Sequence, residues 1–120
     1  MAKITNISAV TIQVTSMPRS FQFYHKILGL KLAYGGENES FSSFEIGGRY
    51  LNLQLSSRCE TRWGRIILHC DDVDGFYREL KRQLEDVSEP QDAPWGERYF
   101  HIRDPDGHEI SIAKPIKSKA

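Results

Sequence analysis

The chain has 120 residues, which suits a single domain that buries a core without disulfides or metals. Lysine plus arginine and aspartate plus glutamate both number 16, so the net charge of zero argues against nucleic acid or an acidic membrane as the main partner. No apolar run is long enough to span a membrane and the first residues show no signal-peptide pattern, so we expect a cytoplasmic protein. Its two cysteines have no paired or metal-binding spacing.

The first half predicts a strand, a helix and three more strands. Alternating apolar residues indicate a strand over residues 4–15. Ser16 is expected to cap a helix that ends at Gly29. Three further strands are predicted, at residues 30–34, 41–46 and 50–55, and Gly47-Gly48 forms a two-residue hairpin turn between the last two.

The second half repeats this order. A strand is predicted over residues 66–70, and Asp71-Asp72 offers a cap for the helix that follows. A weak edge strand is expected near Val87. The last predicted element is a hairpin between residues 93 and 115, closed by a turn at Asp104-Pro105-Asp106-Gly107. One face of this hairpin is apolar, and the other carries polar groups that could contact a ligand.

The two halves also match residue by residue. Four positions of the first half recur at a constant offset of 56, as Val10 with Ile66, Ile12 with Leu68, Val14 with Cys70 and Ser16 with Asp72. We therefore predict an α+β fold of two tandem βαβββ units, with eight strands and two main helices. Unit 1 spans about residues 4–57 and unit 2 about 63–115, together forming one domain over 1–120.

Two segments carry a family resemblance that covers nearly the whole chain. FYHKILGLKL ends the first helix, and WGERYFHIRDPDGHEISI forms the closing hairpin. With the duplicated unit, they resemble the vicinal oxygen chelate superfamily, which includes glyoxalase I, extradiol dioxygenases and the fosfomycin and bleomycin resistance proteins. The resemblance implies a cup-shaped mixed sheet around a cavity and a homodimer. It does not specify an activity, because this fold carries several.

The resemblance also raises the question of a metal. Metal-dependent relatives hold a divalent ion with His, Gln or Glu from the first and last strand of each unit. By register these positions fall on Ala9, Asn52, Arg65 and Ser111. Alanine has no donor atom and arginine is permanently cationic, so we expect no metal and no other cofactor. A register error of two residues would instead bring Gln13, Gln54 or Glu109 into the site.

Nine residues are candidate ligand contacts because they share the predicted cavity face: Gln13, Asn52, Gln54, Arg65, His69, Trp95, Tyr99, His101 and Ser111. Several of these residues could instead have a purely structural role. Arg65 could bind a ligand carboxylate or pair with Glu109. Trp95 could form an aromatic wall or a plug at the hairpin base. His101 could contact a ligand or be a half-buried histidine satisfied by a neighbour.

Three functions follow as hypotheses. The leading one is a metal-independent protein that sequesters a small organic molecule or drug, similar to the bleomycin-resistance-type members. The alternative is a metal-dependent glyoxalase-type lyase or isomerase, or a dioxygenase, acting on a small molecule. The third is a non-catalytic domain that binds another protein.

Overall fold

A computed structural model describes residues 2–116 of the chain, which separate into two compact units. Unit 1 ends at Glu60 and contains β1 (Ala9–Val14), α1 (Met17–Phe21), the π-helix η1 (Gln22–Ile27), β2 (Lys31–Tyr34), β3 (Phe41–Ile46) and β4 (Arg49–Leu55). Unit 2 begins at Thr61 and contains β5 (Arg65–His69), α2 (Val73–Lys81), β6 (Gln91–Ala93), β7 (Glu97–Arg103) and β8 (Glu109–Pro115).

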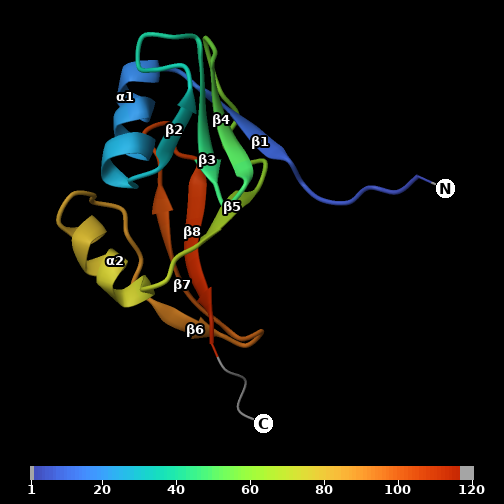
Figure 1. The fold of residues 1–120 in the computed structure, drawn as a ribbon. Helices are drawn as coiled ribbons and strands as arrows, with labels where there is room; N and C mark the ends of the chain where they lie inside the picture. Colours follow the sequence, from blue (N-terminus) through green and yellow to red (C-terminus); the bar gives the residue numbers. More distant parts are fainter. Residues whose placement is uncertain (1, 117–120) are drawn as a thin grey trace. The chain divides into compact units, whose positions relative to one another are not determined.

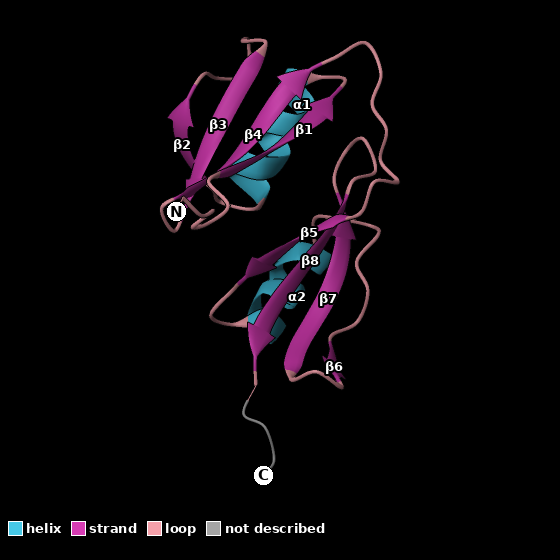
Figure 2. Ribbon diagram, turned by 90° about the vertical axis from the view of Figure 1, so that its right-hand side faces the viewer, coloured by secondary structure: helices cyan, strands magenta, loops and turns pink. Residues whose placement is uncertain are grey.

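Each unit is one four-stranded mixed sheet with helix on one face (Figure 1, Figure 2). The strand order is β1-β4-β3-β2 in unit 1 and β5-β8-β7-β6 in unit 2. The first strand of each unit pairs in parallel with its last strand, and the other pairs are antiparallel. This topology confirms the predicted α+β fold of two tandem βαβββ units.

The helices begin where the sequence predicts and cover the apolar face of each sheet. The Ser16 hydroxyl accepts a hydrogen bond from the Arg19 amide at 3.4 Å, and the Asp72 carboxylate accepts one from the Gly75 amide at 3.0 Å. After one α-helical stretch, the first helix continues as η1, whose Tyr24 is fully buried against Phe44 of β3. In unit 2, α2 contacts β7 and β8.

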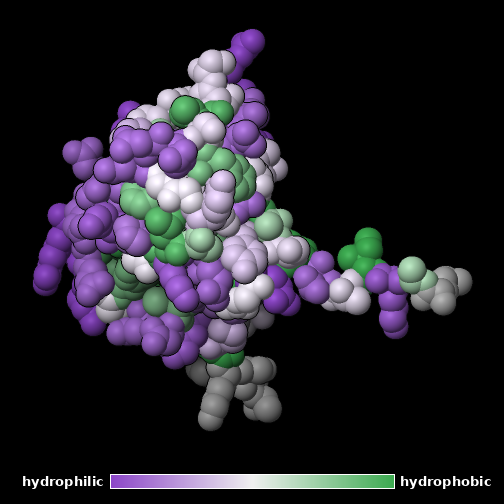
Figure 3. Space-filling model, turned by 45° about the horizontal axis from the view of Figure 1, so that its top comes forward, coloured by the Kyte–Doolittle hydropathy of each residue, from purple (hydrophilic) through white to green (hydrophobic). Residues whose placement is uncertain are grey.

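The first strand is shorter than predicted. Residues 2–8 lie outside any strand, and the pairing of β1 with β4 begins at Ala9. The reason is that β4 starts at Arg49, directly after the Gly47-Gly48 turn. Ser8 still accepts a hydrogen bond from the Tyr50 amide at 3.0 Å, but residues 2–7 have no opposite position on β4. The segment therefore projects from β1 (Figure 1), and its side chains alternate between hydrophobic and hydrophilic in Figure 3. Ile4 and Ile7 are 96% and 72% exposed.

The regular edge strand of the second sheet lies further along the chain than predicted, although Val87 does pair with β7. Val87 makes only an isolated bridge with Ile102, and the edge strand is β6, at Gln91–Ala93. Pro90 separates the two segments and cannot donate to a ladder, which interrupts the edge. The polar sequence of β6 gave no alternation from which to predict it.

The turns at Gly47-Gly48 and at Asp104 to Gly107, which set the strand register, form as predicted. Gly107 has a φ of +99°, and its amide donates to the Asp104 carbonyl at 2.9 Å. The Asp104 side chain accepts from the amides of Asp106 and His108, at 3.0 and 2.8 Å. Because this turn fixes where β8 starts, it also fixes which β8 side chains lie opposite β5 and β7.

Candidate functional site

The register of unit 2 places three rows of side chains on the sheet face opposite α2. Rows are defined by residues paired across β5, β8 and β7. They are Arg65, Glu109 and Arg103; Ile67, Ser111 and His101; and His69, Ala113 and Tyr99. The alternate residues Phe100, Ile102, Ile110 and Ile112 are at most 1% exposed and form the core under the helix. We call the sheet face that carries the three rows the open face of unit 2.

A hollow of about 120 Å³ lies on this open face. Its floor consists of the small side chains Ser111 and Ala113, which are 3% and 1% exposed. Ile67 and Trp95 rise beside them and are 51% and 64% exposed. Small residues flanked by large ones leave a depression in an otherwise flat sheet. We call it the Trp95 hollow, and its lining is Arg65, Ile67, Trp95, Glu97, Tyr99, Ser111 and Ala113.

Aromatic rings form one side of the Trp95 hollow. The rings of Trp95 and Tyr99 are stacked, with centroids 6.1 Å apart and planes at 23°. The Tyr99 ring in turn contacts the His101 ring at 5.1 Å. Trp95 is held on the open face by this stacking, and its exposure fits an aromatic wall better than a buried plug.

Glu97 fixes the aromatic side, and the sequence analysis missed it. Its Oε1 accepts a hydrogen bond from the Trp95 indole nitrogen at 2.8 Å, and its Oε2 lies 3.0 Å from His69 Nε2. Two hydrogen bonds lower the pKa of the Glu97 carboxyl: the one from Trp95 has the larger effect, and the one from His69 the smaller. Glu97 stands two residues before Tyr99 on the same strand, so the alternation of β7 could have identified it.

Arg65 forms the opposite end of the Trp95 hollow. Its Nη1 lies 3.7 Å from Glu109 Oε2, and Arg103 Nη2 lies 3.6 Å from the other Glu109 oxygen. Arg103 also donates to the Gly107 carbonyl at 3.0 Å and lies near Asp86. The predicted pair of Arg65 with Glu109 therefore exists, but at a distance too long for a hydrogen bond.

His101 is satisfied inside the protein. Its Nδ1 lies 2.8 Å from the Ser111 hydroxyl, and its backbone amide donates to the Ser88 hydroxyl. Burial lowers the pKa of the His101 imidazole, which the nearby Glu109 opposes and Arg65 and Arg103 reinforce. The imidazole is therefore neutral near pH 7. It holds the Ser111 hydroxyl from the neighbouring strand β7, on the same face of the sheet.

The remaining predicted residues lie on the open face of unit 1. Asn52 donates to the Thr11 hydroxyl at 3.1 Å, and its carbonyl oxygen is buried without a hydrogen-bond partner in the described part of the chain. Gln13 and Gln54 are paired across β1 and β4. The structure thus brings Arg65, Trp95, Tyr99 and Ser111 of the predicted set together in one hollow of unit 2, with His69 and His101 in contact with its lining. Asn52, Gln13 and Gln54 belong to the other sheet.

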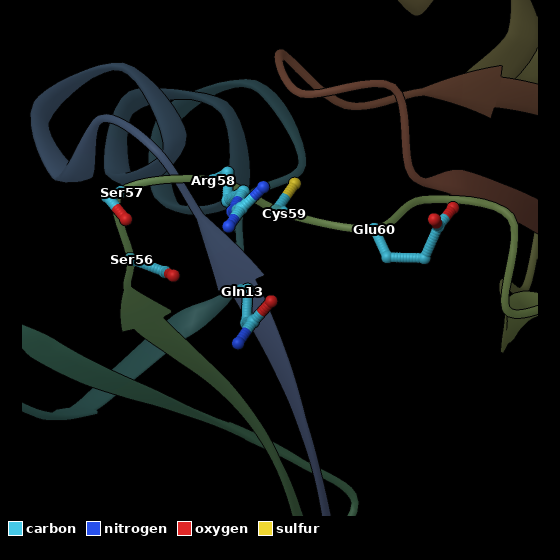
Figure 4. Close-up of a pocket in the computed structure, with 6 residues that line it drawn as sticks. All are labelled: Gln13, Ser56, Ser57, Arg58, Cys59 and Glu60. Atoms are coloured by element: carbon cyan, nitrogen blue, oxygen red, sulfur yellow. The ribbon is translucent and has the colours of Figure 1, made fainter.

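A second, wider hollow of about 430 Å³ lies in unit 1, beside the chain that leaves β4. Figure 4 shows Gln13 on β1 and the consecutive residues Ser56 to Glu60 along this loop. Its lining contains no aromatic ring. Since flat organic ligands are held mainly by apolar and aromatic surface, the Trp95 hollow is the better candidate.

Comparison with known proteins identifies the family. The profile of the Glyoxalase/Bleomycin resistance protein/Dioxygenase superfamily matches residues 6–112. The chain belongs to this superfamily. No curated protein matches it. Among residues 2–116, no helix is long and apolar enough to cross a membrane.

Solved structures of the superfamily share the fold at low sequence identity. Lactoylglutathione lyase from Agrobacterium tumefaciens is 17% identical, with a TM-score of 0.77 over 92% of this chain and 94% of that one. TnmS3, an antibiotic binding protein from Streptomyces sp. CB03234, is 22% identical, with a TM-score of 0.78 over 96% and 99%. A superfamily member from Sphaerobacter thermophilus DSM 20745 is 22% identical, with a TM-score of 0.74 over 92% and 97%. These likenesses show the fold.

The superfamily's metal positions hold poor ligands in this chain. Ala9 offers no donor, Arg65 brings a fixed positive charge, and the Ser111 hydroxyl is already bonded to His101. Asn52 is the one remaining position and has a neutral amide. Within residues 2–116, no group of three or more His, Cys, Asp or Glu side chains is arranged to hold a metal ion. The donor chemistry of the family positions does not fit a divalent cation.

Proposed function

We propose that the protein binds a small organic molecule in the Trp95 hollow and sequesters it in the cytoplasm without transforming it. The observation that carries this proposal is the hollow itself, with a small-residue floor, a stacked aromatic side and an arginine at one end. Ligand sites in proteins combine apolar and aromatic walls with a few polar groups in this way. The antibiotic-binding relative TnmS3 shows that the fold accommodates such a role.

Metal independence is part of the proposal. Binding would rest on Arg65 and the rings of Trp95 and Tyr99, since two of the four family positions, Ala9 and Arg65, offer no metal donor. If the metal-dependent lyase, isomerase or dioxygenase activity were present instead, a divalent ion would co-purify and raise the melting temperature. Elemental analysis of the purified protein separates the two.

We further propose that the protein acts as a homodimer and that residues 4–57 and 63–115 are two units of one domain. The Trp95 hollow holds about 120 Å³, whereas sites for drug-sized ligands hold roughly 300–1,000 Å³. A ligand seated there would need a second surface to cover it, and a second copy of this chain is the partner that the family resemblance implies. Light scattering at micromolar concentration tests the dimer.

The test of the binding site uses Ala113→Gln. Gln54 occupies the position in unit 1 that Ala113 occupies in unit 2, as the two registers show. Placing glutamine at 113 should fill the floor and weaken any ligand found in a thermal-shift screen by at least about tenfold, equal to about 1.4 kcal/mol. A saturating ligand at 100 times its Kd stabilises by about 2.7 kcal/mol, so the screen is sensitive enough.

Lys114→Gln is the matched control, because it adds the same side chain one residue later, outside the lining of the hollow. It should leave affinity unchanged. Chromatography of the ligand after long incubation should recover it intact. A ligand that binds equally well to Ala113→Gln would place the site elsewhere, and a new product would make the protein an enzyme.

A further inference from the structure

We propose that the Trp95 hollow selects planar aromatic carboxylates, with the carboxylate on Arg65, the ring beside Trp95 and Tyr99, and Glu97 as the residue that positions the aromatic side. This inference rests on the proposed function and names the ligand class of the same site. It adds Glu97, which the sequence analysis did not assign, and it predicts which of three chemically matched probes will bind.

The Arg65 end has unused hydrogen-bonding capacity. A guanidinium carries five N–H donors in one plane and matches a carboxylate with two parallel bonds. Within residues 2–116, the Arg65 side chain makes no hydrogen bond and one ion pair, with Glu109 at 3.7 Å. The side chain is 41% exposed and lines the hollow. Because Glu109 is shared with Arg103, it does not occupy the Arg65 fork, and an incoming carboxylate can.

The opposite end has little capacity for a cationic ligand, although Glu97 is a carboxylate. One Glu97 oxygen accepts from the Trp95 indole and the other contacts His69. Both oxygens therefore hold protein groups, and their effect is to fix the Trp95 ring. The stacked pair of Trp95 and Tyr99 then presents a ready aromatic surface that costs little conformational entropy on binding.

The spacing of the two ends suits a ring that bears one carboxylate. Arg65 pairs with Glu109, and Tyr99 pairs with Ala113, four residues further along β8. At about 3.3 Å per residue the two rows lie roughly 13 Å apart, and the arginine and the rings shorten this gap from both sides. The floor between them is Ser111 and Ala113, whose small side chains leave room for a flat ligand.

The experiment compares three probes that share one ring system: 2-naphthoate, 2-naphthamide and 2-naphthylmethylammonium. The readout is the side-chain N–H signal of Trp95 in a ¹⁵N–¹H spectrum, assigned with the variant Trp63→Phe. Trp63 serves as an internal control because its indole donates to His108 at 3.0 Å and it is not part of the hollow. Its signal should stay in place while that of Trp95 moves.

We expect 2-naphthoate to bind at least about tenfold more tightly than the amide, and the ammonium most weakly. Arg65→Ala should lower the affinity for the carboxylate by about ten- to a hundredfold and leave the affinity for the amide unchanged. Arg65→Lys, which keeps the charge but loses the fork, should give an intermediate affinity. Arg78→Ala on α2 is the matched control and should change neither. Glu97→Gln should weaken the uncharged amide, because it loosens the aromatic side, and the loss of its negative charge should change the affinities of the carboxylate and the ammonium in opposite directions relative to the amide.

Three results would overturn this inference. The amide could bind as tightly as the carboxylate, the ammonium could bind most tightly, or neither Arg65→Ala nor Arg65→Lys could change the affinity for the carboxylate. In each case binding in the hollow, and so the proposed function, would stand. If instead neither these probes nor any compound of the thermal-shift library moved the Trp95 signal, the proposed function itself would fail.

Discussion

In unit 1 the middle row of the open face consists of Thr11, Asn52 and Ser43, and the equivalent row of unit 2 consists of Ile67, Ser111 and His101. The next row compares Gln54 with Ala113 at the centre and Phe41 with Tyr99 beside it. Both units therefore keep an aromatic residue at the same place. The floor differs, because unit 1 carries long amides where unit 2 carries small side chains.

This comparison shows how a duplicated fold can keep a binding hollow on one of its two sheets. The Asn52 amide donates to the Thr11 hydroxyl on the neighbouring strand β1, whereas the short Ser111 side chain bonds to His101. The aromatic pair of unit 1, Tyr34 and Phe41, has centroids 6.3 Å apart, close to the 6.1 Å of Trp95 and Tyr99, but its planes are tilted by 55° instead of stacked at 23°. The two floor positions and the stacking of the rings therefore both distinguish the units.

The largest expected effect tests whether the two cores are equivalent. Leu53 and Ile112 occupy matching positions on β4 and β8 and are 0% and 1% exposed. Leu53→Ala and Ile112→Ala should each lower the free energy of unfolding by about 2–5 kcal/mol, because both leave a cavity. Urea denaturation followed by circular dichroism measures both. A loss below about 1 kcal/mol in either would mean that the two cores are not packed alike.

A smaller effect is expected at the two helix caps. The cap bond of Asp72 is 3.0 Å long and that of Ser16 is 3.4 Å, so the cap of α2 has the better geometry. Asp72→Ala should cost about 1 kcal/mol of unfolding free energy, and Ser16→Ala should cost less. Asp71→Ala, next to the cap, is the control and should cost least. Equal losses at positions 16 and 72 would remove this difference between the units.

The smallest effect concerns pH. His101 stands where unit 1 has Ser43, and burial lowers the pKa of its imidazole in the folded state. Unfolded histidine binds a proton near pH 6.5, so His101 contributes stability above that pH, and the contribution falls as the pH drops below it. The free energy of unfolding should therefore decline less steeply in His101→Ser than in the parent as the pH falls from 7.5 to below about 6.5.

Paired denaturation curves of the parent and His101→Ser measure this effect, since the other histidines contribute to both proteins and cancel in the difference. A decline that is unchanged in the variant would show that burial does not lower the pKa of the His101 imidazole.

Local signals in the sequence determined most of the fold. Alternating apolar residues gave the strands, Ser16 and Asp72 the helix starts, and Asp104 to Gly107 the closing turn. These features act within a few residues, so the sequence carries them directly. The repeat with an offset of 56 then indicated two tandem units, and the hairpin motif indicated the family. Glu109 was one of the two partners considered for Arg65, and the two side chains lie 3.7 Å apart in the structure.

What only the tertiary structure decided depends on neighbours across strands. β1 is cut short because β4 begins after a tight turn, and β6 is a strand only because β7 pairs with it. The Trp95 hollow exists because residues far apart in sequence, such as Ile67 and Ser111, share a row in which one side chain is large and the other small. Glu97 gained its position from contacts with Trp95 and His69. Pairing across a sheet is set by register and packing together, and no single stretch of sequence contains both.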